Sequence, residues 1–189
     1  MIKISNLSKN YKVGGQKVRA LDNISLTIKK GEFLVIVGPS GSGKSTLMHL
    51  IGGLDKPTSG TVTVNGEPLA RMGDKQLSAF RNGKIGFIFQ DFKLHPHLSI
   101  LENVKIPLIL NKKKRFNKTG IQKKASALLK EVGLENREIH KPDEISGGQK
   151  QRAAIARALI NEPSIILAMP AVVSAVRVFW FFKLLSASW

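Results

Sequence analysis

The chain has 189 residues, of which 42% are hydrophobic and 23% are charged, as in a globular protein large enough to bury a core. It contains no cysteine. Disulfides and thiolate metal sites are therefore excluded, and a reducing intracellular setting is favoured. Residues 1–30 mix Lys, Asn and Gly with short apolar runs, so we expect no secretory signal.

The formal net charge of +17 suggests a nucleic-acid partner, but its distribution argues against one. Eight Lys or Arg and no acid lie between Asn111 and Lys130, where they overlap an amphipathic helical pattern. The apolar positions of that pattern are Ile121, Ala125, Leu128, Leu129 and Val132. We interpret the run as the solvated face of a helix. Nucleic-acid binding stays an alternative, which a steep salt dependence would support.

The N-terminal part of the chain has the patterns of strands. Three segments alternate apolar and polar residues: Ile2–Leu7, Ile24–Ile28 and Thr61–Val64. Turn signals follow two of them, at Lys30-Gly31 and Asn65-Gly66. The continuous apolar run Phe33–Val37 predicts a buried central strand.

Helical periodicity begins after a Gly-rich loop, with Leu47, Leu50 and Ile51 on one face. Ile85–Phe89 predicts a short buried strand. The pattern is then helical, with helices expected near 99–110, 119–132 and 149–160, until Ser164–Ala168 returns to a strand. Strands, helices and a final strand predict an α/β core interrupted by a helical subdomain.

Residues 38–46 match the phosphate-loop pattern G-x-x-x-x-G-K-[ST], between a strand pattern and a helix pattern. The residues expected to contact nucleotide are Gly38, Pro39, Ser40, Gly41, Ser42, Gly43, Lys44, Ser45 and Thr46. Glycines bring backbone N–H groups close to phosphate, and the helix start adds its dipole. Lys44 supplies a cation for the β- and γ-phosphates, Ser45 a hydroxyl for Mg²⁺, and Thr46 a further hydroxyl. The alternative is a Gly-Ser-rich surface turn.

A second candidate anion site is Ser146-Gly147-Gly148-Gln149, at the start of a predicted helix. By itself it could equally be a capped helix. Together with the phosphate loop, it resembles the signature of ABC transporter ATPases, and the resemblance extends over residues 1–168. It implies a P-loop NTPase core of ABC type, with an N-terminal antiparallel β subdomain and an inserted helical subdomain.

The resemblance also implies roles for two residues that are unremarkable alone. Tyr11 lies where the family places an aromatic ring on adenine, and Gln90 matches the glutamine that joins the metal and water site to the transmembrane partner. Lys44 and Gln90 would serve catalysis, and Ser45 and Gln90 would serve the metal. The implied cofactors are ATP and Mg²⁺.

The implied assembly is a head-to-tail pair of ATP-binding subunits, in which each ATP lies between one phosphate loop and the other subunit's signature. This pair would be cytoplasmic, bound peripherally beneath a membrane permease on the inner face of the cell membrane. Leu98–Val104 and Ile106-Pro107-Leu108 resemble the subgroup that serves lipoprotein-release, macrolide-export and antimicrobial-peptide-export permeases.

The chain departs from the family after Ala168. The family continues this strand into an Asp-Glu pair that serves Mg²⁺ and the attacking water, whereas Met169-Pro170 stand here. Residues 171–189 show no D-loop pattern and no switch histidine, and no span long enough for a membrane helix. We therefore expect impaired hydrolysis, and a core left incomplete at its C-terminus by truncation or frame disruption.

The predicted organisation is a first part of the ATP-binding core at 1–90, a helical subdomain at 91–158, a return strand at 159–168 and an atypical tail at 169–189. The leading hypothesis is the ATP-hydrolysing subunit of an export-type transporter. The alternatives are a nucleotide-binding remnant without turnover and a nucleic-acid-associated ATPase. Because the core would lack later strands, we expect exposed apolar surface and marginal stability.

Overall fold

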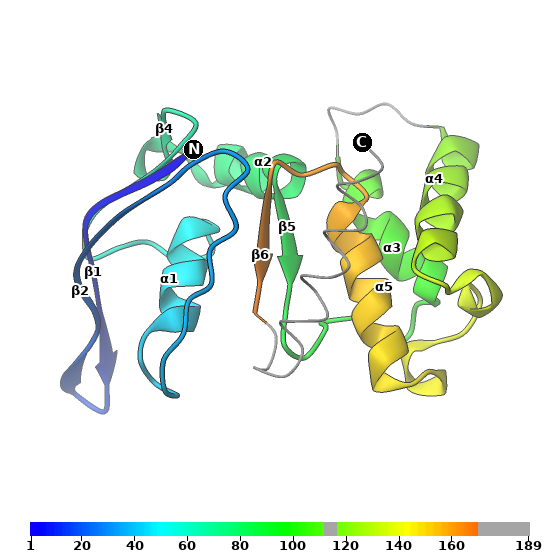
Figure 1. Ribbon diagram of the computed structural model, residues 1–189, viewed down its shortest axis with the longest axis horizontal. Helices are drawn as coiled ribbons and strands as arrows, with labels where there is room; N and C mark the ends of the chain where they lie inside the picture. Colours follow the sequence, from blue (N-terminus) through cyan, green and yellow to red (C-terminus); the bar gives the residue numbers. More distant parts are fainter. Residues whose placement is uncertain (112–116, 170–189) are drawn as a thin grey trace. The chain divides into compact units, whose positions relative to one another are not determined.

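A computed structural model describes residues 1–111 and 117–169 of the chain (Figure 1). The chain divides into two compact units, with the boundary between Arg81 and Asn82. Each unit has its own sheet: four strands in the first and two in the second, among the residues described. The antiparallel β subdomain, the α/β character and the inserted helices agree with the fold class predicted from the sequence.

The first unit is built on an antiparallel sheet with the strand order β2-β1-β3-β4. Its strands are β1 (Ile2–Val13), β2 (Gln16–Ile28), β3 (Ser59–Val64) and β4 (Glu67–Pro68). Apolar side chains alternate toward the core, where Ile4, Leu7 and Val64 are at most 2% exposed. Asn65 and Gly66 both have positive φ angles, of 50° and 86°, as the predicted tight hairpin turn requires.

Helices complete the first unit. Helix α1 (Lys44–Ile51) buries Leu47, Leu50 and Ile51, the three residues that predicted it. The 3₁₀ turn η1 (Leu69–Arg71) precedes α2 (Asp74–Lys84), a helix that sequence reasoning missed. Only Leu77 of α2 is buried, so the helix has no apolar stripe, and Arg81 ties it to the end of α1 by donating to the Gly53 carbonyl at 2.8 Å.

The prediction of a buried strand at Phe33–Val37 is wrong. Residues 32–39 belong to no strand, and Phe33, Val35 and Val37 are 59%, 58% and 84% exposed. A continuous apolar run shows that a segment can be buried, but a central strand also needs neighbours on both edges. Among residues 1–81, no described strand forms a ladder with this segment. Exposed apolar surface, which we expected, therefore lies directly before the phosphate loop.

The second unit joins a parallel strand pair to a helical subdomain. Strands β5 (Ile85–Ile88) and β6 (Ile165–Ala168) pair in parallel, and the chain between them forms the helices. These are α3 (Ile100–Ile109), α4 (Lys118–Glu131) and α5 (Gly147–Leu159), with the 3₁₀ turns η2 (Glu135–Arg137) and η3 (Pro142–Glu144). All three helices were predicted, and in Figure 1 they lie side by side.

The core of the helical subdomain explains two patterns in the sequence. On α4, Ala125 and Leu129 are fully buried and Leu128 packs beside them, so the predicted amphipathic face is confirmed. On α3, Ser99 and Glu102 form a complete capping box, and the buried Asn103 amide donates to the carbonyls of His95, Leu98 and Ser99. This part of the segment Leu98–Val104 therefore has a structural role in fixing the entry to α3.

Candidate nucleotide-binding site

The phosphate loop has a backbone that only glycine can supply at its critical points. Gly38, Gly41 and Gly43 have φ angles of 153°, 80° and 85°. A Cβ on Gly43 would lie 2.4 Å from the Ala20 carbonyl oxygen of β2, and one on Gly38 would lie 2.9 Å from the Ser42 hydroxyl. The β2 backbone therefore requires glycine at Gly43, and the positive φ angles favour glycine at Gly38 and Gly41.

The start of α1 leaves backbone donors available for an anion. The helix N-cap is Gly43, which has no side chain to accept hydrogen bonds from the first turn. Ser45 is exposed, so its hydroxyl can reach a phosphate-bound cation. Residues 38–42 are exposed as well, whereas Gly43, Lys44 and Thr46 are half-buried. N–H groups of this kind, together with the helix dipole, favour phosphate.

The Lys44 ammonium group lies inside the loop. It donates to the carbonyl oxygens of Gly38 at 2.9 Å and Pro39 at 2.6 Å, and to the Ser42 hydroxyl at 3.3 Å. These three acceptors are uncharged, so a phosphate oxygen could replace one of them with a stronger charge-assisted hydrogen bond. The loop thus holds a cation where a polyphosphate would lie.

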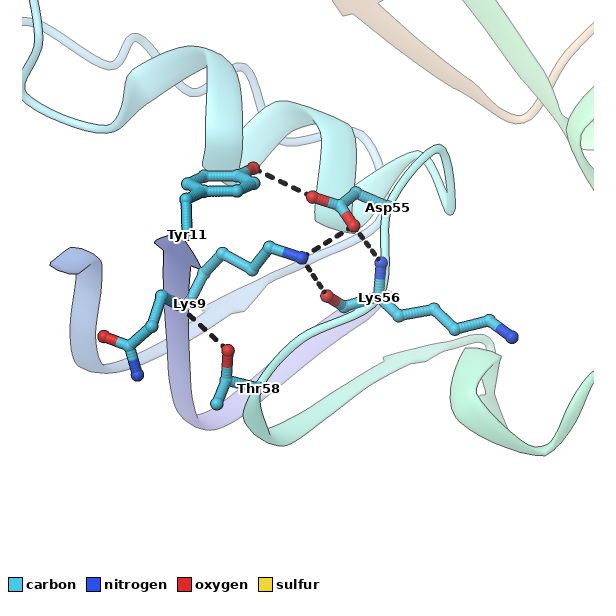
Figure 2. Close-up of polar contacts among 6 residues, drawn as sticks. Lys9, Tyr11, Asp55, Lys56 and Thr58 are labelled. Atoms are coloured by element: carbon cyan, nitrogen blue, oxygen red, sulfur yellow. Dashed lines mark hydrogen bonds and ion pairs between the residues drawn. The ribbon is translucent and has the colours of Figure 1, made fainter. Parts of the chain in front are cut away.

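Tyr11 lies on β1 and takes part in a polar cluster with Lys9 and Asp55 (Figure 2). Its hydroxyl donates to Asp55 Oδ2 at 2.8 Å, and the Lys9 ammonium lies 4.8 Å from the centre of its ring. The Thr46 side chain of α1 lies near the same hydroxyl. The structure therefore brings the candidate base-stacking residue to the phosphate loop.

The charges of this cluster affect its titration. Burial, and next the hydrogen bond to Asp55, raise the pKa of Tyr11 above its ordinary value. For Asp55, burial acts to raise the pKa, but hydrogen bonds from Lys9 and Tyr11 outweigh it and leave the pKa below its ordinary value. Near neutral pH, Tyr11 is therefore a neutral phenol and Asp55 a carboxylate.

Gln90 follows β5 at the start of a tight turn, and its side chain is exposed. Phe92 and Lys93 have left-handed backbones, with φ angles of 59° and 47°, which is unusual for residues with side chains. Arg157 of α5 holds them by donating to both carbonyls, at 2.6 Å for Phe92. Burial lowers the pKa of Arg157 from its usual value. Helix α5 therefore holds the turn that follows β5 and carries Gln90.

The candidate signature forms the N-terminus of α5. Ser146 and Gln149 make a reciprocal capping box, in which Ser146 Oγ accepts from the Gln149 N–H and Gln149 Oε1 accepts from the Ser146 N–H. Gly147 and Gly148 are exposed, and a Cβ on either would meet no atom of the described chain within 4 Å. These glycines are not required by the packing of this chain.

At Met169, where the resemblance implies the first acid of the Asp-Glu pair, the strand continues. Met169 donates its backbone N–H to the Ile88 carbonyl at 2.8 Å, so the pairing of β5 and β6 extends to the residue that replaces the aspartate. The predicted departures at Pro170 and in residues 171–189 lie outside the described residues. Within the described ranges, no group of three or more His, Cys, Asp or Glu could hold a metal ion.

Sequence reasoning missed Asp55 and Arg157. Their partners lie far along the chain, 44 residues away for Asp55 and Tyr11 and 65 for Arg157 and Phe92. No local sequence pattern predicts hydrogen bonds between residues so far apart. The phosphate loop was, by contrast, located from its glycines and flanking periodicity, whereas the signature, Tyr11 and Gln90 were identified through the family resemblance.

A glycine-built phosphate loop at the start of a helix, in an α/β chain, defines a P-loop nucleotide-binding protein. The family model described as ABC transporter matches residues 21–168. The chain is 50% identical over 171 residues to the ABC transporter ATP-binding protein YknY of Bacillus subtilis, across 89% of this chain and 72% of that relative. It is 51% identical over 168 residues to YvrO of the same organism, with the same two coverages.

Solved structures are similar as well. A dimer of the ATP-binding cassette MJ0796 of Methanocaldococcus jannaschii, in a post-hydrolysis state bound to ADP and Pi, has a TM-score of 0.88 and 44% identity, covering 97% of this chain and 82% of that one. A second dimeric structure of MJ0796 has a TM-score of 0.89 at 44% identity, covering 100% and 84%. The chain belongs to the ABC transporter family, among its ATP-binding subunits, a family of ATPases.

In the part of the chain that the structure describes, no helix is both long enough and apolar enough to cross a membrane.

Proposed function

We propose that the chain binds ATP with its phosphate loop, residues 38–46, and stacks the adenine on Tyr11. The observation that carries this proposal is the loop geometry: three glycines with positive φ before an uncapped helix start, with the Lys44 ammonium inside. The nearness of the Tyr11 hydroxyl to the Thr46 side chain supports it, because base and phosphate contacts would then lie at one end of α1.

The test of ATP binding is Lys44→Ala, measured by calorimetry, with Lys30→Ala as the matched control in an exposed turn. Losing a charged donor to the phosphates should weaken ATP about 10- to 100-fold, while the control keeps the parent affinity. Unchanged affinity in folded Lys44→Ala protein would overturn the proposal.

Magnesium would come to this site with the nucleotide. The Ser45 hydroxyl is exposed and can act as one ligand, and we propose Gln90 as a further contact. The donor set fits a nucleotide-borne ion but not a resident one, since Mg²⁺ sites normally include a carboxylate and Met169 stands where the family has aspartate. Mg²⁺ neutralises phosphate charge when bound, while Lys44 and the loop N–H groups position the polyphosphate.

We propose that two copies pair head to tail, with Ser146, Gly147, Gly148 and Gln149 of one copy facing the ATP of the other. Two observations support this. The glycines are exposed and have open space around them, and a capped Ser146 hydroxyl that accepts from Gln149 can still donate its own proton to a phosphate. The similar cassette MJ0796 is dimeric.

The pairing can be tested with Gly148→Glu, which places an anion where the other copy's phosphates would lie. ATP should dimerise the parent chain in light scattering, and the variant should stay monomeric while keeping the parent's affinity for ATP. Gly83→Glu, at a glycine of α2 that likewise has no positive φ and no described atom within 4 Å of a Cβ, is the control for added charge. Dimerisation of Gly148→Glu with ATP would reject the head-to-tail arrangement.

Hydrolysis is proposed to be impaired. Met169 cannot hold Mg²⁺ and Pro170 cannot position or deprotonate water, and a missing general base costs about 10²–10⁴-fold in rate. A nucleotide-binding subunit without turnover is therefore the second candidate function. Phosphate release and ATP binding, measured on one preparation, separate the two: binding without release favours the second candidate.

At the level of the cell, we propose a peripheral subunit on the inner face of the membrane that couples ATP to export or extraction by a permease. The resemblance of Leu98–Val104 and Ile106-Pro107-Leu108 to exporter-type subunits supports this. The hydrogen bonds of Arg157 also connect α5 to the turn that follows Gln90. In this proposal, residues 1–90 and 159–168 form the ATP-binding core, and 91–158 carry motion to the permease. Co-purification with a defined permease from membranes tests it.

A further inference from the structure

Asp55 makes hydrogen bonds to side chains that are distant in the sequence. It lies just beyond the end of α1, on the segment that leads to β3. Its Oδ2 accepts the Tyr11 hydroxyl at 2.8 Å, and its Oδ1 accepts the Lys9 ammonium and the Lys56 N–H, each at 2.7 Å (Figure 2). One carboxylate thus fixes the tyrosine, the cation above its ring and its own backbone.

We propose that Asp55 is a positioning residue for nucleotide binding, which holds the Tyr11 ring in the orientation that stacks on the base. This inference rests on the proposed function, because it assumes that Tyr11 contacts adenine. Asp55 itself would touch no part of the ATP. Its effect would pass through the Tyr11 hydroxyl alone.

The contacts around Tyr11 restrict where a base can lie. The ring is fixed at its hydroxyl by Asp55. Of the cations that the structure describes, Lys9 lies over the ring at 4.8 Å from its centre, and it covers one face. An adenine base must therefore stack on the opposite face of the Tyr11 ring. The cluster of Lys9, Tyr11 and Asp55 thus determines which face of the ring is open to the base.

Fixing the ring before ATP arrives should increase affinity. A side chain immobilised only on binding costs conformational entropy, and a ring already held in place avoids that cost. The corresponding gain is roughly two- to twelvefold in affinity. Because the phosphate contacts do not involve Tyr11, the gain should apply to ATP and not to inorganic tripolyphosphate.

A purely structural role is the competing explanation, since Asp55 also accepts the Lys56 N–H and pairs with Lys9. In that case, loss of the carboxylate would disturb the end of α1 and weaken ATP and tripolyphosphate together. The ratio of the two affinities separates the explanations. Tyr11→Phe gives an independent check, because it removes the same hydrogen bond and leaves Asp55 in place.

The experiment measures affinities for MgATP and magnesium tripolyphosphate on the full chain carrying Asp55→Asn, Tyr11→Phe, both changes, or Tyr11→Ala. Each single change should weaken ATP two- to twelvefold with tripolyphosphate unchanged, and the double variant should be no weaker than the singles. Asp22→Asn is the matched control, an exposed carboxylate paired with Arg19 on β2.

A spectroscopic readout comes from the composition, because the chain contains one tyrosine. With 3-fluorotyrosine incorporated, the protein has a single ¹⁹F resonance that reports on Tyr11. Without nucleotide, Asp55→Asn should shift and broaden this resonance as the ring gains freedom, and Asp22→Asn should leave it unchanged.

The outcomes distinguish the two levels of the proposal. If Tyr11→Ala weakens ATP but Asp55→Asn and Tyr11→Phe do not, Asp55 has no positioning role and adenine stacking stands. If Tyr11→Ala also leaves ATP affinity unchanged while Lys44→Ala weakens ATP as expected, the adenine role of Tyr11 fails. Equal weakening of ATP and tripolyphosphate by Asp55→Asn would overturn the positioning role in favour of a structural one.

Discussion

The starts of α1 and α5 are both glycine-containing helix N-termini, yet the chain builds them in different ways. At α1 the N-cap is Gly43, with a left-handed backbone and no capping side chain. At α5, Ser146 and Gln149 cap the helix completely, and the glycines after Ser146 have no intrachain requirement. The first site depends on backbone conformation, and the second on side chains plus open space for something outside the chain.

The largest expected effect comes from Gly43→Ala. The new Cβ would lie 2.4 Å from the Ala20 carbonyl oxygen in a backbone with φ of 85°. We expect a loss of at least about 3 kcal/mol in the free energy of unfolding, together with loss of ATP binding. Denaturant unfolding and calorimetry measure both.

A matched control isolates the contact from the conformation. Gly15 has a nearly equal φ of 82°, but a Cβ there meets no described atom within 4 Å. Gly15→Ala should therefore cost only about 1 kcal/mol, and ATP affinity should not change. If Gly43→Ala and Gly15→Ala lower the free energy of unfolding equally, close packing against β2 is not the reason for glycine at position 43.

Ser146→Ala should have an intermediate effect. It removes the acceptor for the Gln149 N–H, and the loss of such a cap costs about 1 kcal/mol of stability. ATP binding to the single chain should be unaffected, while ATP-driven pairing should weaken. Unchanged thermal stability would mean that the capping box contributes little to α5.

Gly148→Ala should be the mildest of the substitutions for folding. Because open space surrounds the position, the free energy of unfolding should change by no more than about 0.5 kcal/mol. Pairing with ATP should still be reduced, since a methyl group would then stand in the contact with the second copy. If Gly148→Ala lowered the free energy of unfolding as much as Gly43→Ala, glycine would be required for folding at both helix starts, which contradicts the comparison.

The smallest effect is a pH dependence at the α1 site. The folded pKa of Tyr11 is raised, so its contribution to stability is complete below about pH 10 and is lost as the pH rises through the folded value. Absorbance at alkaline pH should give a midpoint above the ordinary value. Asp55→Asn should lower this midpoint without making it ordinary, because burial remains. A midpoint unchanged in Asp55→Asn would argue against the hydrogen bond in solution.

The sequence predicted those parts of the fold whose signals are local. Alternation gave β1 and β3, and helical spacing gave α3, α4 and α5. Helix α2 was not predicted because Leu77 is its one buried residue, so the sequence shows no helical apolar pattern there. Phe33–Val37 was wrongly predicted as a strand because an apolar run does not reveal whether neighbouring strands exist.

The same reasoning applies to the candidate site. The phosphate loop is a contiguous motif, so its spacing located it, and the signature was identified together with it through the family resemblance. Asp55 and Arg157 act through partners that are distant in the sequence. Only the folded chain brings them together, which is why the residues that hold Tyr11 and the Gln90 loop could not be predicted.

The hydrogen bonds from Arg157 to the carbonyls of Phe92 and Lys93 have a mechanical consequence. Helix α5 has 13 residues and therefore spans about 20 Å, with the Ser146 end at its start and Arg157 in its last turn. A helix of this length behaves as a stiff rod, so a tilt imposed at its first turn would displace the far end as a lever does. The turn after β5 would then be pulled along, with no need for α5 itself to bend.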